Sequence, residues 1–149
     1  MPLSDKQYLQ INQAVFSLAN AYRVRCINEK VKEGLGLTLP EQAVLMVLGQ
    51  LTPINSRQLS RAMNINPGTI SVRLESLIKK KLVKKEQDQE DRRNWRLLLT
   101  EEGEELYQLT IAGTATYTRD FISVLSKNEQ RDLHRSLSKI AHSLGYDWQ

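Results

Sequence analysis

The sequence has few of the residues that covalent cross-links and metal sites require. Its 149 residues include one cysteine, Cys26, and two histidines. A single cysteine excludes an intrachain disulfide framework and is typical of proteins in a reducing compartment. The histidines, His134 and His142, are two helical turns apart, whereas metal-binding pairs on a helix are usually one turn apart. We therefore expect no metal and no cofactor.

Long apolar runs are also missing. The longest, at 43–49, is far shorter than the roughly 20 residues that cross a bilayer. The first residues, Met1 to Lys6, are polar and lack the apolar core of a signal peptide. The sequence contains no glycine-rich phosphate loop, no Gly-x-Ser-x-Gly elbow and no recognisable pair of nucleophile and base. It therefore predicts a cytoplasmic protein that is neither a membrane protein nor an enzyme.

Positive charge is concentrated in one third of the chain. Overall, 21 lysines and arginines exceed 17 acidic residues, for a net charge of +4 and a pI of about 9.3. Residues 53–100 contain eleven of the basic and five of the acidic residues, a net charge of +6 that leaves −2 on the rest. Such a segregated basic segment is typical of a nucleic-acid-binding surface. Composition alone leaves open a solvated basic face without a ligand.

Helical signals dominate the first part of the chain. Ser4 and Gln7 fit a capping box, and the apolar residues after them recur every three or four positions. We expect this helix to run to about Glu33, where Gly34 and Gly36 end it. Its apolar stripe is longer than one small domain needs, which indicates a partner chain.

Three further helices are indicated outside the basic segment. Thr38-Leu39-Pro40-Glu41 is a second capping box, and the apolar residues at 43–51 after it predict a buried, central helix. A long helix begins at Thr100, and Ser126 to Glu129 form a capping box for the last one. The last helix has one apolar face, made of Leu133, Leu137, Ile140, Ala141 and Leu144.

Inside the basic segment, two short helices and a hairpin are expected. Asn55 or Ser56 caps a helix at 57–63, Asn64 provides a turn with positive φ, and Asn66 caps a helix at 67–80 whose first residue is proline. Strand-like residues at 82–86 and 94–99 flank a charged turn that is longer than two residues. This order predicts a helix-turn-helix followed by a β-hairpin wing.

The helix at 67–80 has a face suited to the major groove of DNA. On a helical wheel, the side opposite its apolar residues is small and polar, made of Gly68, Val72, Glu75, Ser76 and Lys79. Arg73 is the best candidate for bidentate hydrogen bonds to guanine, and Val72 or Thr69 for contact with a thymine methyl group. The candidate DNA-binding residues before the wing are Asn55, Ser56, Arg57, Asn66, Thr69, Ser71, Val72, Arg73, Ser76 and Lys80.

The hairpin turn adds a second cationic element. We expect Arg92 or Arg93 to enter an adjacent minor groove, where narrow A·T tracts attract arginine, and the other to be held by Asp91. Arg96 completes the candidate DNA-binding set. A solvated hairpin with a local ion pair is the alternative.

Several of these segments together resemble the MarR family of bacterial and archaeal transcription regulators. The resemblance covers about a third of the chain. It rests on Leu59 to Ser71, on Leu74 and Leu77, on Leu82-Val83, on Asp88 to Arg93, and on Leu99-Thr100-Glu101-Glu102-Gly103. It implies an obligate homodimer, held by the first and last helices, that binds a palindromic operator in double-stranded DNA, most often as a repressor. This chain departs from the family pattern at Val72, where arginine is frequent, and at Lys81, where glycine is usual.

The expected fold is therefore mainly α, or α+β, with a winged helix-turn-helix domain flanked by dimerisation helices. We assign residues 1–36 to an N-terminal dimerisation helix, 37–100 to the DNA-binding domain and 101–149 to C-terminal dimerisation helices. The resemblance also implies a small-molecule effector of unknown identity, for which Tyr22, Cys26 and Tyr107 are candidate contacts. Core packing is the simpler role for both tyrosines. Two alternatives remain open, a thiol redox regulator acting through Cys26 and a winged-helix adaptor that binds a protein.

Overall fold

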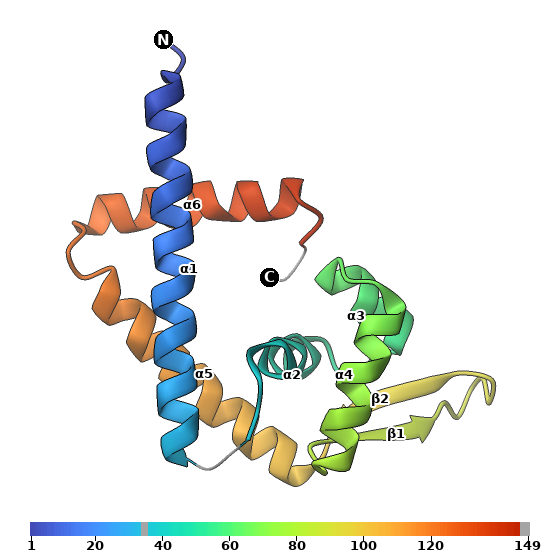
Figure 1. Cartoon of the computed structure of the whole chain (residues 1–149). Coiled ribbons are helices and arrows are strands. Elements are labelled where there is room, and N and C mark those ends of the chain that lie inside the picture. Colours follow the sequence, from blue (N-terminus) through green and yellow to red (C-terminus); the bar gives the residue numbers. More distant parts are fainter. Residues whose placement is uncertain (34–35, 147–149) are drawn as a thin grey trace. The chain divides into compact units, whose positions relative to one another are not determined.

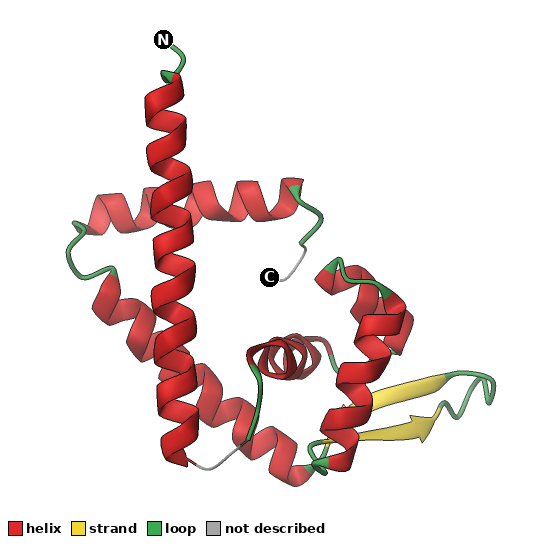
Figure 2. Cartoon of the chain, viewed as in Figure 1, coloured by secondary structure: helices red, strands yellow, loops and turns green. Residues whose placement is uncertain are grey.

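The computed structural model describes residues 1–33 and 36–146, with the side chains of 26–33 left out (Figure 1). The elements follow the order α1 (Asp5–Glu33), α2 (Leu39–Leu51), α3 (Ser56–Met63), α4 (Pro67–Lys79), β1 (Val83–Gln87), β2 (Trp95–Leu99), α5 (Glu101–Phe121) and α6 (Lys127–Ser143). Figure 2 shows that helices make up most of the chain and that the strands form one hairpin. The predicted mainly α fold with a winged helix-turn-helix is confirmed.

The chain divides into two compact units, Met1–Leu39 and Pro40–Gln149. The first consists of α1, which the predicted capping box begins: the Ser4 backbone N–H donates to Gln7 Oε1 at 2.9 Å. Its large apolar side chains are exposed, namely Tyr8, Leu9, Ile11, Val15, Phe16, Leu18 and Val24. Gly34, one of the two glycines expected to end this helix, lies outside the described residues.

The core of the second unit is formed by α2, α3, α4 and the base of the hairpin. As the apolar run predicted, α2 is central, with Val44, Leu45 and Leu48 fully buried. They share the core with Leu59, Met63, Ile70, Leu74, Leu77, Val83 and Leu97. Leu97 is also held by its backbone, because its N–H donates to the Ile54 carbonyl at 2.7 Å. This bond ties the hairpin to the segment between α2 and α3.

The hairpin is antiparallel, and Val83 pairs with Leu99, Lys85 with Leu97 and Gln87 with Trp95. Alternation along a strand places these six residues on one face. Near the base this face is buried through Val83 and Leu97, and toward the turn it is exposed. The turn at 88–94 is longer than two residues, as the sequence predicted.

The junction of α4, β1 and α5 shows the structural roles of Lys81 and Thr100, two positions of the family pattern. The N–H groups of Lys81 and Leu82 donate to Ile78 and Leu77, which closes α4 in a Schellman motif. Lys81 has φ of 59°, so lysine occupies the left-handed position where the family resemblance expects glycine. Thr100 donates from its hydroxyl to the Lys81 carbonyl at 2.6 Å and from its backbone N–H to the Leu82 carbonyl at 3.1 Å.

Gly103 allows this close approach. A Cβ atom at residue 103 would lie 1.9 Å from the Leu82 carbonyl oxygen, whereas a Cβ at Gly113, also in α5, would have nothing within 4 Å. The two glycines therefore form a matched pair, one at a tight backbone contact and the other in open space.

We expect Gly103→Ala to lower the free energy of unfolding by about 1–3 kcal/mol, because α5 must move away from Leu82. Gly113→Ala should raise it by about 0.5–1 kcal/mol, since alanine has the higher helix propensity. Urea denaturation of both variants, at equal protein concentration, checks the pair. Equal effects of the two substitutions would contradict the contact at Leu82.

Candidate nucleic-acid interface

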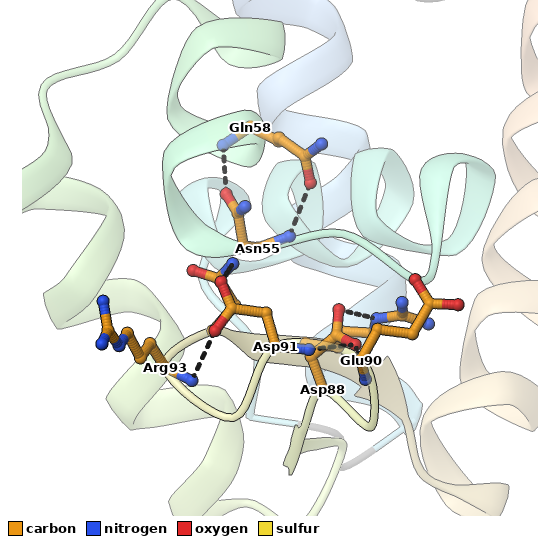
Figure 3. Close-up of polar contacts among 8 residues, drawn as sticks. Asn55, Gln58, Asp88, Glu90, Asp91 and Arg93 are labelled. Atoms are coloured by element: carbon orange, nitrogen blue, oxygen red, sulfur yellow. Dashed lines mark hydrogen bonds and ion pairs between the residues drawn. The ribbon is translucent and has the colours of Figure 1, made fainter.

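The α3–turn–α4 segment is stabilised by helix caps that the sequence predicts. Asn55 Oδ1 accepts from the Gln58 backbone N–H at 2.8 Å, and Gln58 Oε1 accepts from the Asn55 N–H at 2.9 Å (Figure 3). Asn64 ends α3 with φ of 50°. Asn66 Oδ1 then accepts from the Gly68 N–H at 2.8 Å, with Pro67 at the first position of α4. These caps hold both helices at a fixed turn.

The outward face of α4 is exposed and small. Its exposed residues are Gly68, Thr69, Ser71, Val72, Glu75 and Lys79. Arg73 is half-buried, and in the described part of the chain its guanidinium makes no hydrogen bond or ion pair. At the start of α3, Ser56 and Arg57 are exposed, while Asn55 is half-buried and engaged in its cap. Most of the residues expected to face the major groove are therefore exposed.

Two candidate residues make contacts that the helical wheel does not report. Ser76, expected on the outward face, is half-buried, and its hydroxyl donates to Glu41 Oε1 of α2. Lys80 Nζ lies 2.8 Å from both carboxylate oxygens of Glu41. The expectation that Ser76 points outward is wrong, because Glu41 of α2 offers a buried hydrogen-bond acceptor. The apolar periodicity of α4 contains no information about a residue on another helix. Lys80 carries a positive charge that Glu41 already neutralises.

Glu41 is the centre of this contact. Its side chain is 6% exposed, against 33% for Lys80. A carboxylate buried to this extent needs a charged partner and further hydrogen bonds, which Lys80 and Ser76 supply. Sequence reasoning assigned Glu41 only to a helix cap, and no local signal shows that it faces a helix about 35 residues further along the chain.

The wing turn is organised around two aspartates. Asp88 accepts from Arg96 Nε at 2.7 Å and from the Glu90 backbone N–H at 2.9 Å. These bonds stabilise the ionised carboxylate, the backbone bond most strongly, and hold the pKa of Asp88 below its ordinary value of 3.8. Arg96, a candidate DNA-binding residue, is thus engaged in an ion pair at the base of the turn.

The second aspartate corrects one expectation. Asp91 was expected to hold an arginine side chain, but its Oδ1 accepts from the Arg93 backbone N–H at 3.0 Å, and its Oδ2 accepts from Asn94 Nδ2 at 3.0 Å (Figure 3). A backbone donor two residues away competes successfully with a long, exposed side chain. In the described chain, the guanidinium groups of Arg92 and Arg93 therefore remain exposed and without ion pairs.

The candidate effector residues belong to two different compact units. Tyr107 of α5 is buried against Gly49 of α2, and burial, with a smaller contribution from Glu104, raises the pKa of its hydroxyl. Tyr22 is half-buried on α1, in the other compact unit, and the Cys26 side chain lies outside the described residues. Among the described residues, no group of three histidine, cysteine or acidic side chains is arranged to hold a metal, and no helix is long and apolar enough to cross a bilayer.

The fold and this exposed basic surface define the class of the protein, a winged helix-turn-helix protein of the kind that binds nucleic acid. The model of the MarR family matches residues 37–95. The transcriptional regulator MgrA of Staphylococcus aureus is 31% identical over 146 residues, which cover 95% of each chain. The chain belongs to the MarR family, whose members are transcriptional regulators that bind DNA and are not enzymes.

Solved structures agree on the fold. A MarR transcriptional regulator from Methanosarcina mazei has 25% identity and a TM-score of 0.76, over 89% of this chain and 94% of its own. FabT of Streptococcus pneumoniae, solved in complex with DNA, has a TM-score of 0.81 over 92% of this chain and 96% of its own. At 22% identity, the likeness to FabT shows a shared fold alone.

The buried pair of Glu41 and Lys80 generates a stability prediction. Lys80→Met should lower the free energy of unfolding by about 1–3 kcal/mol, because it removes the ammonium that lies 2.8 Å from both oxygens of the buried Glu41 carboxylate, and the partial exposure of Lys80 limits the cost. Adding Glu41→Gln should restore most of the loss, since no buried charge then remains. Urea denaturation measures all three proteins.

Lys79→Met provides the matched control for this cycle. Lys79 is exposed and adjacent in sequence, so its replacement should change the free energy of unfolding by less than about 0.5 kcal/mol. If Lys79→Met and Lys80→Met had the same effect, the pair with Glu41 would not stabilise the fold.

Proposed function

We propose that the protein is a homodimeric regulator that recognises a palindromic operator through α4 and the wing, and represses transcription there until an effector releases it. The observation that carries the proposal is the pairing of two exposed elements. The outward face of α4 is small and polar, and the wing turn beside it in the sequence presents Arg92 and Arg93 without ion pairs. A helix suits the major groove, and arginine suits the minor groove.

Base reading is assigned to α4. Arg73 is the candidate for guanine, and the exposed Val72 and Thr69 are candidates for a thymine methyl group. Ser56, Arg57, Asn66 and Ser71 are candidates for phosphate contacts, which set the register. Ser76 and Lys80 are left out of the interface because their polar groups bind Glu41. The DNA complex of FabT, which has the same fold, supports a DNA-bound arrangement of this kind.

Dimerisation is supported by apolar faces that the single chain leaves uncovered. On α6, no residue is buried, although Leu137, Ile140 and Leu144 lie on one side and are each more than half exposed. The apolar side chains of α1 are likewise exposed. Faces of this size on an isolated chain indicate an interface. We assign 1–36 and 101–149 to dimerisation and 37–100 to DNA binding, with half-sites about one helical turn, 10 bp, apart.

The effector and the location complete the proposal. A small molecule that changes the spacing of the two winged domains would release the operator, with Tyr22, Cys26 and Tyr107 as the candidate contacts. The cytoplasm, where the bacterial chromosome is accessible, is the expected location.

DNA binding is tested by selecting sites from a pool of random duplexes and measuring affinity for the enriched sequence. We expect a palindrome, and an affinity that falls by about 10³–10⁵ between 50 and 200 mM salt, as for proteins with 6–10 phosphate contacts. Arg73→Ala should relax selection at one base pair of each half-site, at a cost of about 1–3 kcal/mol per contact. Arg92→Ala with Arg93→Ala should lower affinity and the salt dependence.

Lys139→Gln, which removes one exposed charge from α6, is the control for these variants and should leave affinity unchanged. Failure of the wild-type protein to enrich any sequence would contradict the proposed function. Unchanged binding after loss of Arg73, Arg92 and Arg93 together would contradict the assigned interface.

Dimerisation is tested by sedimentation. The wild-type protein should sediment as a dimer at micromolar concentration, and Leu137→Glu with Ile140→Glu should sediment as a monomer, because two charges enter an apolar interface. The monomer should keep its helical circular dichroism, since both side chains are exposed in the single chain. A monomeric wild-type protein would show that the exposed apolar faces serve another purpose.

A further inference from the structure

A hollow separates the start of α3 from the exposed part of the wing. Its volume is about 290 Å³, and it is lined by Ser56, Lys85, Trp95 and Leu97. In the hairpin, Lys85 pairs with Leu97, and Trp95 is two residues before Leu97 on β2, so all three share one face. Leu97 is 1% exposed and forms the floor, whereas Trp95 is 53% exposed. The apolar face of the wing thus extends from the buried Leu97 to the indole ring of Trp95, which is about half exposed.

Three polar groups around this hollow have no partner in the described part of the chain. The Lys85 ammonium, the Trp95 indole N–H and the Ser56 hydroxyl make no hydrogen bond or ion pair there. The ammonium and the indole are donors only, and the hydroxyl can donate. Of the residues that the structure describes, no acidic one lines the hollow. Such a set of donors around an apolar floor suits a ligand that has acceptor oxygens, negative charge and some apolar surface.

The next residue on β1 shows the contrast. Lys84 lies on the opposite face of the hairpin and pairs with Glu86 Oε1 at 2.7 Å. Of these two neighbouring exposed lysines, therefore, one has its charge partly neutralised and the other presents a full charge toward the hollow. The difference sets Lys85 apart from a generally solvated basic strand.

A DNA backbone has the required chemistry. Its phosphodiester carries one negative charge and acceptor oxygens, and its deoxyribose offers apolar surface to an aromatic ring. In the proposed complex, α4 occupies the major groove and the wing turn reaches the minor groove, so the strand between these grooves passes the face of the wing that carries the hollow. A protein surface is the other kind of partner that an exposed tryptophan suits, but it does not explain the convergence of three donors.

We propose that Ser56, Lys85 and Trp95 form a slot for one phosphodiester of the operator backbone, which positions the wing on the duplex without reading sequence. The proposal rests on the proposed function and deepens it, because Lys85 and Trp95 were not among the residues that the sequence indicated. The slot contributes equally to binding of specific and nonspecific DNA, since every sequence presents the same backbone.

The test uses the full chain, the operator obtained by selection and an unrelated duplex of equal length. Trp95→Ala should lower affinity for both duplexes about tenfold, toward the lower end of the loss when an aromatic ring stacked on a base is removed, because here the ring contacts only the sugar-phosphate backbone. The ratio of the two affinities should stay unchanged. Lys85→Gln should lower both affinities and reduce the slope of log affinity against log salt by about 0.9 for each subunit. Lys84→Gln is the matched control, expected to bind within about twofold of the wild type.

Fluorescence gives an independent readout. In a Trp148→Phe background Trp95 is the single tryptophan, because the chain has two. Its emission should change on addition of either duplex, and the same titration with Lys85→Gln should need more DNA. Thermal unfolding identifies any loss of fold in Trp95→Ala, and Lys85→Gln, an exposed substitution, tests the slot without that complication.

The outcomes separate this inference from the proposed function. If the wild-type protein binds its operator while Trp95→Ala and Lys85→Gln bind as tightly, the slot is wrong and the proposed function stands. If the wild-type protein binds no DNA, both fail. If Trp95→Ala lost affinity for the operator but not for the unrelated duplex, Trp95 would contact bases instead of the backbone. If the emission of Trp95 did not change on addition of DNA, the slot would be wrong and a protein would be the expected partner of this surface.

Discussion

The backbone carbonyls of Lys81 and Leu82 are the point on which the DNA-binding unit depends. They lie between the end of α4 and the start of β1, and Thr100 at the start of α5 donates to both. The same threonine hydroxyl accepts from the Gly103 N–H at 3.0 Å, so it caps α5 as well. Three elements therefore meet at one pair of peptide groups, and any change in the direction of α5 is transmitted to the C-terminal end of α4.

Glu41 constrains the other side of α4. It ties the C-terminal part of that helix to the first turn of α2, through Ser76 and Lys80. A buried ion pair is seldom the most stabilising solution, because desolvation of both charges opposes their attraction. Its directional bonds nevertheless specify one orientation of α4 against α2. Thr100 holds the peptide groups that follow α4, and Glu41 binds Ser76 and Lys80 near the same end of that helix. These bonds restrict the rotation of α4 about its axis and keep its small, polar face pointing outward.

Local sequence signals predicted most of the fold and part of the site. Asn55, Asn64, Asn66 and Ser126 act through hydrogen bonds or backbone angles within a few residues of themselves, which a sequence displays directly. The inward position of Ser76 was not predictable in this way, because a helical wheel assigns faces from the apolar residues of one helix and ignores an acid on another. The hollow beside Trp95 could not be predicted from the sequence for the same reason. It joins residues from α3 and both strands, and only their register places them together.

Asn64 links the turn between α3 and α4 to the end of α6. Its backbone takes the left-handed conformation that ends α3, and its side-chain Nδ2 donates to the Leu144 carbonyl at 2.8 Å, at the end of α6. Gly145 next to it has φ of 84°, and a Cβ there would approach Asn64 Nδ2 to 3.3 Å. The turn between α3 and α4 is thus held from the far end of a helix whose apolar face is exposed. The position of this turn therefore depends on the position of α6, through the carbonyl that Asn64 binds.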